Sequence, residues 1–193
     1  MYQTLLRDSS FFALLLQLDH DRAAEVRQAG CPCGGVLHSA HYPRKPRGGP
    51  EGLGAEYSLR LSFCCCVEGC RRRQTPPALR FLGRKVFFAV WVLLLPVLRE
   101  GPTRQRLQRL EEVYAVSRRT LLRWRRFWRE QMPGSRFWQA RQGHFARPVA
   151  LEALPGSLLE AFSPQAPPHE RVLSALRWLA PLSCRGSLAE RAF

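Results

Sequence analysis

The sequence predicts a mainly α-helical protein with a small β zinc ribbon, on three observations. Apolar residues recur at near-helical spacing on both sides of residues 31–78. That central segment is rich in turns and carries two groups of cysteines. Farther along, a short turn joins two helical patterns, which is typical of a helix-turn-helix. We therefore expect an N-terminal helical segment (1–30), a zinc ribbon (31–78), a three-helix helix-turn-helix domain (79–132) and a loosely structured helical tail (133–193).

The N-terminal segment is expected to form one amphipathic helix or two, ended by Gly30. Its spaced apolar residues are Leu5, Leu6, Phe11, Phe12, Leu15, Leu18 and Val26. The apolar stretch 11–18 is short, follows the acidic Asp8 and lacks a cleavage site, so it does not resemble a secretory signal. The longest apolar run, Val86–Leu98, contains Pro96 and is too short to span a bilayer. We expect no membrane partner and a cytoplasmic, nucleoid-associated protein, in which cysteines serve as thiols or metal ligands.

Positive charge is concentrated in the middle of the chain. There are 30 Lys+Arg against 15 Asp+Glu, for a formal net charge of +15. Residues 31–85 and 86–129 each carry a net charge of +7, whereas the two ends are nearly balanced. Arginine codons in a GC-rich genome would also raise the charge, but would spread it evenly. The clustering therefore favours a polyanionic partner, either nucleic acid or an anionic membrane surface.

Two knuckles could supply four ligands to a structural Zn²⁺. Cys31 and Cys33 stand in a Cys-Pro-Cys-Gly-Gly run, and Cys65 and Cys70 lie about thirty residues later. Zinc is held tetrahedrally by four such thiolates. The strand expected at 57–63 and the loop at 43–54 would connect the two knuckles.

The ligand set has alternatives. The first knuckle is C-x-C where C-x-x-C is usual, and the partner of Cys70 could be Cys64 or Cys66 in place of Cys65. His38 or His41 could also replace a cysteine. A further alternative is that the thiols are merely buried, as is expected of Cys184.

The segment 79–132 is expected to be helical, with breaks at Pro96 and at Gly101-Pro102. A helix capped by Thr103 would pack through Leu107, Leu110 and Val113 or Tyr114. After a turn at Ala115-Val116, Ser117 would cap a second helix. Its inward stripe is Leu121, Trp124 and Trp128, and the run 86–98 would pack beneath both helices.

The second helix of this pair is the expected DNA-recognition element. Residues 117–129 hold six arginines and no acidic residue. An ordinary solvated helix is the alternative, but the preceding helix, the turn and the serine cap favour DNA. The residues expected to enter the major groove are Arg118, Arg119, Arg123 and Arg126. The residues expected to hold phosphates are Arg71, Arg72, Arg73, Arg44, Lys45 and Arg47.

The tail is expected to contain two weak helices, near 151–162 and 170–179. An apolar stripe in the first of them could be core or an interface for a transposase or another protein. Its residues are Leu151, Leu154, Leu158, Leu159 and Phe162.

Taken together, several runs resemble small bacterial zinc-ribbon proteins associated with insertion sequences, often described as transposase-like. The runs are Cys-Pro-Cys-Gly-Gly, Tyr42-Pro-Arg-Lys-Pro-Arg-Gly48, Gly-Cys70-Arg-Arg-Arg, Arg80-Phe-Leu-Gly-Arg84 and Val116-Ser-Arg-Arg-Thr-Leu. The resemblance covers roughly residues 25–130. It implies a DNA-recognition module from a mobile element and does not by itself imply transposition.

Catalysis is not expected. All three aspartates, Asp8, Asp19 and Asp21, lie near the N-terminus, so a two-metal nuclease site cannot be assembled around them. No Walker loop, dinucleotide fingerprint or nucleophile elbow is present. We expect a double-stranded DNA-binding protein that serves a mobile element as recognition module or accessory protein. The alternatives are a transcription regulator with the same module, and an adaptor or decayed transposase remnant; RNA binding is the weakest, since no aromatic platform is apparent.

Overall fold

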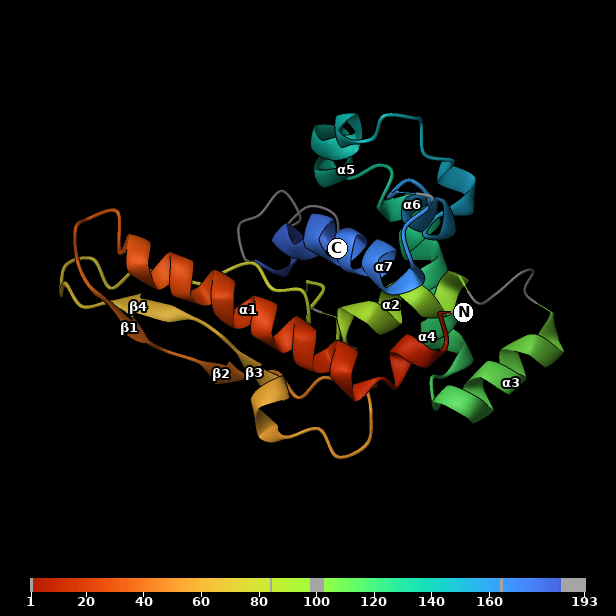
Figure 1. Cartoon of the computed structure of the whole chain (residues 1–193), viewed down its shortest axis with the longest axis horizontal. Coiled ribbons are helices and arrows are strands. Elements are labelled where there is room, and N and C mark those ends of the chain that lie inside the picture. The colour runs from red at the N-terminus through yellow and green to blue at the C-terminus, as the bar shows by residue number, and fades with distance from the viewer. Residues whose placement is uncertain (1, 84, 98–102, 164, 185–193) are drawn as a thin grey trace.

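The computed structural model describes residues 2–83, 85–97, 103–163 and 165–184 (Figure 1). After a 3₁₀ turn at Thr4–Leu6, helix α1 (Ser9–Ala29) runs along one side of the molecule. The Asp8 carboxylate caps this helix, because it accepts hydrogen bonds from the amides of Ser10 and Phe11. Gly30, with φ of 71°, ends it as expected.

Short antiparallel strands follow α1. Strands β1 (Leu37–Ser39), β4 (Phe63–Cys65) and β5 (Arg73–Gln74) form one sheet, and β2 (Tyr42–Pro43) pairs with β3 (Leu59–Arg60). The single strand expected over 57–63 is therefore wrong. Tyr57 belongs to a 3₁₀ helix (Ala55–Ser58), and the chain changes pairing partner between Arg60 and Phe63. At this crossing the Ser62 carbonyl accepts a hydrogen bond from the Ala40 amide at 2.8 Å.

Helix α2 (Ala89–Val97) lies at the centre of the helical part. The expectation of helix from Leu79 onward is wrong. Residues 79–83 and 85–88 form bends, a turn and isolated bridges, in which Phe81 pairs with Phe88 and Arg47 with Phe87. Pro96 falls at the end of α2, and the break expected at Gly101-Pro102 lies outside the described residues. No helix in the described part of the chain has the length and apolar character needed to cross a membrane.

The remaining helices form the rest of the helical part. They are α3 (Arg104–Tyr114), α4 (Arg118–Arg126), a π-helical turn (Phe127–Gln131), α5 (Arg136–Arg141), α6 (Gly156–Glu160) and α7 (Pro168–Leu179). Three 3₁₀ turns complete the tail, at Gln142–His144, Leu151–Ala153 and Ala180–Ser183. The two helices expected in the tail correspond to α6 and α7.

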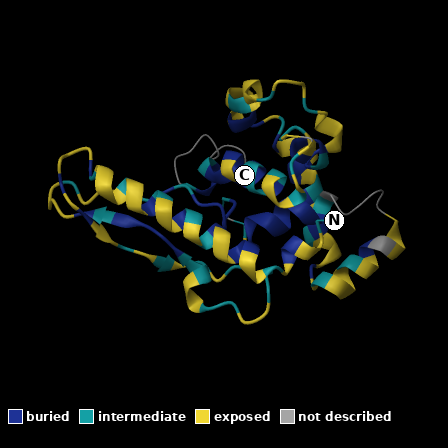
Figure 2. Cartoon of the chain, in the orientation of Figure 1, coloured by how far each residue is buried: buried dark blue, intermediate teal, exposed yellow. Residues whose placement is uncertain are grey.

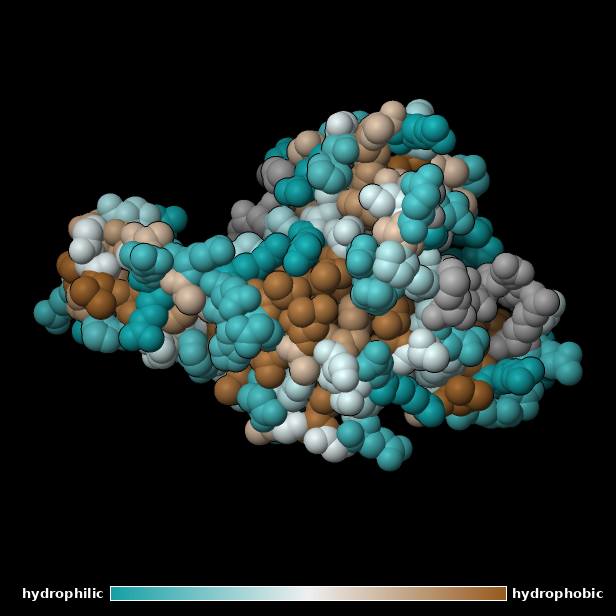
Figure 3. Space-filling model, viewed as in Figure 1, coloured by the Kyte–Doolittle hydropathy of each residue, from teal (hydrophilic) through white to brown (hydrophobic). Residues whose placement is uncertain are grey.

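One apolar core joins α1 and α2 to α3–α7, and Figure 2 shows its buried segments at the centre of the molecule. The tail was expected to be loosely structured, but its described residues, 133–163 and 165–184, are part of this core, since Leu158, Leu159 and Trp178 are all buried. The apolar stripe of the tail is thus mainly core, although Leu151 remains 40% exposed. Some apolar atoms do reach the surface, over the middle of α1 and at the ribbon end of the molecule (Figure 3).

Two buried arginines tie the ribbon to the helical core, a role that the sequence analysis did not give them. Arg80 Nε donates to the Asp19 carboxylate of α1 at 2.7 Å, and its other nitrogens donate to carbonyls within residues 56–59. Arg60 Nη2 donates to the carbonyl and hydroxyl oxygens of Ser183. Burial lowers the pKa of Arg60. Guanidinium groups here act as internal hydrogen-bond donors.

Candidate metal centre and nucleic-acid interface

The first knuckle is a tight turn immediately after α1. The Gly34 amide donates to the Cys31 carbonyl at 2.8 Å, and the Cys31 amide donates to the Gly35 carbonyl at 3.0 Å. Gly34 has φ of 84°, which glycine adopts without the steric cost of a Cβ. This turn brings the side chains of Cys31 and Cys33 to the same end of the ribbon.

The second knuckle follows β4. The Cys70 amide donates to the Val67 carbonyl at 3.0 Å, and the Cys65 amide donates to the Arg72 carbonyl at 3.0 Å. Cys65 pairs directly with Leu37 of β1, so the sheet holds this knuckle against the first. Arg71 follows with φ of 42° and turns the chain back toward β5.

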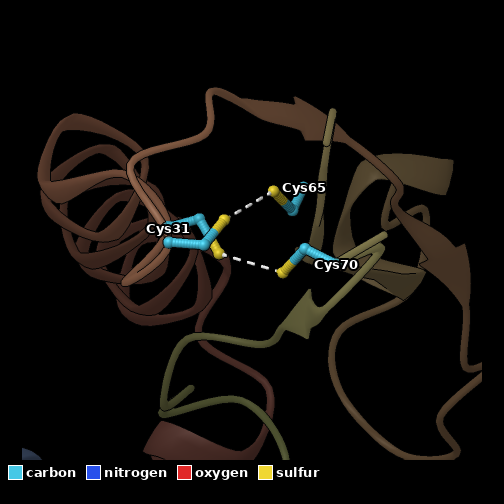
Figure 4. Close-up of side chains that lie close together, drawn as sticks. Cys31, Cys65 and Cys70 are labelled. Carbon is cyan, nitrogen blue, oxygen red and sulfur yellow. Dashed lines mark hydrogen bonds between the residues drawn. The ribbon is translucent and has the colours of Figure 1, made fainter. Parts of the chain in front are cut away.

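The two knuckles bring four thiols together. The Sγ atoms of Cys31, Cys33, Cys65 and Cys70 all lie within 4.8 Å of one another. Sγ of Cys31 is 3.7 Å from that of Cys70, and Sγ of Cys33 is 3.4 Å from that of Cys65 (Figure 4). With Zn–S bonds of about 2.3 Å, a tetrahedral site has sulfur–sulfur edges of about 3.8 Å. The donor set therefore fits a tetrahedral metal ion, and these are the four cysteines that the spacing favoured.

The alternative ligands do not join this group. Cys64 Sγ lies 3.4 Å from the Arg71 carbonyl, and Cys66 is exposed. Successive side chains of a strand point to opposite faces, so when Cys65 points inward, Cys64 and Cys66 point away. His41 Nδ1 is engaged with the backbone of Ser62, and His38 is exposed.

The four thiols have unequal acidities. A hydrogen bond from the Gly35 amide, together with the neighbouring thiols, lowers the pKa of Cys33 to about 7. At Cys65 the Val67 amide favours the thiolate, but burial and the neighbouring thiols outweigh it and raise the pKa to about 12. One proton is thus lost easily while others are retained, because clustered thiolates repel one another. A bound divalent cation would compensate that repulsion.

Gly35 has no side chain, and the cysteine cluster occupies the space where its Cβ would lie. A Cβ at this position would lie 2.6 Å from Cys65 Sγ and 2.7 Å from Val67 Cγ2. We expect Gly35→Ala to weaken metal affinity on the order of 10- to 100-fold, a loss typical of disturbed outer contacts. Competition with a chromogenic chelator measures it. Gly69→Ala is the matched control, since a Cβ there meets nothing within 4 Å; equal affinities in the two variants would contradict the packing argument.

Between α3 and α4, the turn and the Ser117 cap lie where the sequence predicted. Ala115 turns the chain with φ of 50°, Val116 is fully buried, and Ser117 Oγ accepts a hydrogen bond from the Thr120 amide. On α3, Tyr114 packs on the core whereas Val113 is 47% exposed. The inward stripe is buried as expected, at Leu121, Trp124 and Trp128.

The outward side of α4 is cationic. The arginines expected to enter a DNA groove are all exposed, namely Arg118, Arg119, Arg123 and Arg126. Arg126 Nε donates to Glu130 at 2.8 Å, but both side chains are mostly exposed, and such pairs contribute little. The helix thus exposes several guanidinium groups on its outer face, while its inner face is packed in the core.

The arginines that follow the last cysteine are exposed as well. Arg71 and Arg72 lie at the surface of the second knuckle. Arg73 Nη1 donates to the Ala40 carbonyl and to Ser62 Oγ, and its guanidinium lies over the Tyr42 ring. Arg73 therefore braces the ribbon in addition to contributing charge.

The basic residues of the loop at 43–54 differ in how far they are buried. Lys45 and Arg47 are exposed. Arg44 is half-buried, and its Nη2 donates to the carbonyls of Gly83 and Lys85 at 3.0 and 3.2 Å. Burial lowers the pKa of Arg44. Arg44, from which a phosphate contact is expected, thus makes internal hydrogen bonds through Nη2 and is less exposed than Lys45 and Arg47.

Within the described part of the chain, the four cysteines are the one group of three or more Cys, His, Asp or Glu side chains placed to hold a metal ion. Thiolate sulfur favours soft or borderline cations such as Zn²⁺. Comparison with protein-family models, curated proteins and solved structures gave no match.

Proposed function

We propose that this protein binds double-stranded DNA through helix α4, with a structural Zn²⁺ held by Cys31, Cys33, Cys65 and Cys70, and that it has no catalytic role. The zinc would lock the two knuckles together without an open coordination position, because four thiolates complete a tetrahedron. Its role would then be to hold the ribbon folded.

The observation that carries the DNA proposal is the division of α4 into two faces. Leu121 and Trp124 anchor the helix in the core, and Trp128 beyond its end donates from Nε1 to the Val92 carbonyl at 2.8 Å. The opposite face exposes arginines without an acidic residue between 113 and 129. Guanidinium groups on a fixed helix bind phosphates and can read guanine edges in a major groove. A helix this cationic is stabilised when a polyanion neutralises it.

The setting in which the DNA is bound follows from the resemblance stated above. It suggests the ends of a bacterial mobile element. A transcription regulator with the same module is the second candidate, and terminal inverted repeats beside the gene would distinguish the two. Both settings require the same α4 surface.

The test neutralises two exposed arginines of α4. We expect the Arg119→Gln/Arg123→Gln variant to bind a fluorescein-labelled random-sequence 20-bp duplex at least about 10-fold more weakly. The slope of log Kobs against log salt should fall by about 2, since each lost phosphate contact removes about 0.9. Fluorescence anisotropy measures both quantities.

The matched control is Arg136→Gln/Arg177→Gln, which removes the same charge from exposed positions on α5 and α7. It should retain wild-type affinity within about twofold if α4 is the contact surface. If both double variants lose the same amount of DNA affinity, the loss is due to net charge alone, and α4 is not the contact surface.

A further inference from the structure

We infer that α4 and the metal ribbon bind the same DNA duplex along a continuous row of basic residues, which we call the basic track. The two contacts lie about one turn of the DNA double helix apart. The track consists of Arg72, Lys45, Arg47, Lys85 and Arg123. This inference rests on the proposed DNA binding by α4 and adds a second contact, a spacing and a new phosphate-binding residue, Lys85.

Helix α1 sets the spacing. Near its start, Phe12 packs edge-to-face against Phe88, with ring centroids 5.0 Å apart, in the core that also contains α4. Near its end, Ala23 packs in the separate apolar cluster of the ribbon with Leu37 and Phe63. Figure 1 shows the ribbon and α4 toward opposite ends of this helix. A 21-residue helix is about 30 Å long, close to the ~34 Å repeat of B-DNA.

The first part of the track leads out of the ribbon. Arg73 lies with its guanidinium 5.7 Å from the centroid of the Tyr42 ring and donates to the Ala40 carbonyl. The segment that carries Tyr42 continues directly into Lys45 and Arg47, both exposed. In Figure 1 this stretch passes from the ribbon along the lower edge of the molecule. The cations that follow the second knuckle therefore lie beside the segment that leads to the cations of the loop.

The loop is fixed against the helical core. The Arg47 amide donates to the Val86 carbonyl at 2.8 Å, and the Phe88 amide donates to the Arg47 carbonyl at 3.1 Å. Gly48 comes so close to Trp91 that a Cβ there would lie 2.5 Å from the indole ring. Such contacts hold Lys45 and Arg47 in a set position relative to α2, which in turn packs on α4.

Lys85 connects the loop to α4. Its ammonium nitrogen lies 4.5 Å from the centroid of the Phe127 ring, just beyond the end of α4. The Phe127 amide donates to the Arg123 carbonyl, so Lys85 lies at the end of α4 that carries Arg123. Burial and the charge of Arg123 lower the pKa of Lys85. Beside it, Phe87 packs against Trp124 with ring centroids 5.0 Å apart. A phosphate at this point would meet Lys85 and Arg123 together.

The segments that build the track lack acidic residues. Residues 37–50, 69–99 and 113–129 contain no Asp or Glu. Clustered cations raise one another's energy, and a row of phosphates relieves this cost along its whole length. The chemistry of the surface thus fits a duplex lying from the ribbon to α4.

The experiment compares duplex lengths using the full chain. An 8-bp random-sequence duplex, closed by a short loop, is about 27 Å long and too short to reach both ends. A 20-bp duplex reaches both. We expect Arg71→Gln/Arg72→Gln to weaken binding to the 20-bp duplex about 10-fold and to change binding to the 8-bp duplex less than twofold. Arg119→Gln/Arg123→Gln should weaken binding to both. On the 20-bp duplex, Lys85→Gln should lower the salt slope by about 1.

Three results are distinguishable. A ribbon variant that binds both duplexes like the wild type, beside an α4 variant that is weakened on both, overturns the two-point contact and leaves DNA binding by α4 intact. Equal losses of the ribbon variant on both lengths also overturn it, since one compact site would suffice. No binding of either duplex by the wild type overturns the proposed function itself. Metal content of the ribbon variant, measured in parallel, shows that its knuckles remain folded.

Discussion

One Zn²⁺ per chain is the expected content of the protein purified under reducing conditions, and Cys31→Ser or Cys70→Ser should abolish it. The Sγ atoms of these two residues lie 3.7 Å apart, and each belongs to a different knuckle. A serine hydroxyl at either position is a far poorer zinc ligand than a thiolate, and the three remaining thiols leave the tetrahedron open. Elemental analysis of the desalted protein by plasma mass spectrometry measures the ratio.

Loss of the metal should also unfold the ribbon. Its apolar cluster is small, formed by Ala23, Cys31, Leu37, Leu61, Phe63 and Cys65. A core of this size does not stabilise a fold by itself, so the binding free energy of the metal becomes folding free energy. We expect chelator treatment to expose the segment 31–75 to limited proteolysis while the helical core persists.

Cys64→Ser is the matched control, because Cys64 is adjacent to a ligand but faces the Arg71 carbonyl. It should retain one zinc per chain. Loss of zinc in Cys64→Ser with retention in Cys31→Ser would show that the ligand set is wrong. If well-folded wild-type protein contains no metal, the proposed zinc site is wrong, and only the proposed DNA binding by α4 remains.

A loss of about 3–5 kcal/mol in unfolding free energy is expected for Asp19→Ala, the size typical of breaking a buried ion pair. Asp19 is 2% exposed; one carboxylate oxygen accepts from the Leu79 amide at 2.6 Å and the other from Arg80 Nε at 2.7 Å. Removing the carboxylate leaves the Arg80 guanidinium buried without its counter-charge. It also leaves the Leu79 amide without its hydrogen-bond acceptor. Urea unfolding followed by circular dichroism measures the change.

Asp21→Ala provides the comparison on the same helix. Its carboxylate is exposed and accepts a hydrogen bond from Gln17 Nε2 within α1. We expect a change within about 0.5 kcal/mol for this surface position. Similar unfolding midpoints for Asp19→Ala and Asp21→Ala would mean that the buried pair does not connect α1 to the 79–80 segment in solution.

The elements that the sequence predicted well are those with local causes. Ser117 begins α4 and Gly30 ends α1, each through hydrogen bonds made within a few residues, and both lie where expected. The choice of Cys65 as the partner of Cys70 follows from the spacing of the two residues, which leaves room for a turn through Glu68-Gly69. Each of these signals depends on short-range geometry that the residue types themselves impose.

The expectations that failed depended on distant partners. The apolar run after Leu79 has helical composition, but residues 87 and 88 form isolated bridges, from Phe87 to Arg47 and from Phe88 to Phe81, and the helix begins only at Ala89. The half-burial of Arg44 was likewise not predicted, and its Nη2 donates to carbonyls about forty positions away in sequence. A sequence pattern does not reveal which carbonyl a guanidinium will reach, so the internal hydrogen bonds of Arg60 and Arg80 could not be predicted either.

The sequence alone therefore determined the mainly helical class, the four cysteines that come together and the arginine-rich, serine-capped helix α4, because caps, knuckles and amphipathic stripes are encoded over one or two turns of chain. Only the tertiary structure decided which arginines face inward, how the tail enters the core and how α1 spaces the ribbon from α4. Those features depend on burial, and burial is a property of surfaces brought together from distant parts of the chain.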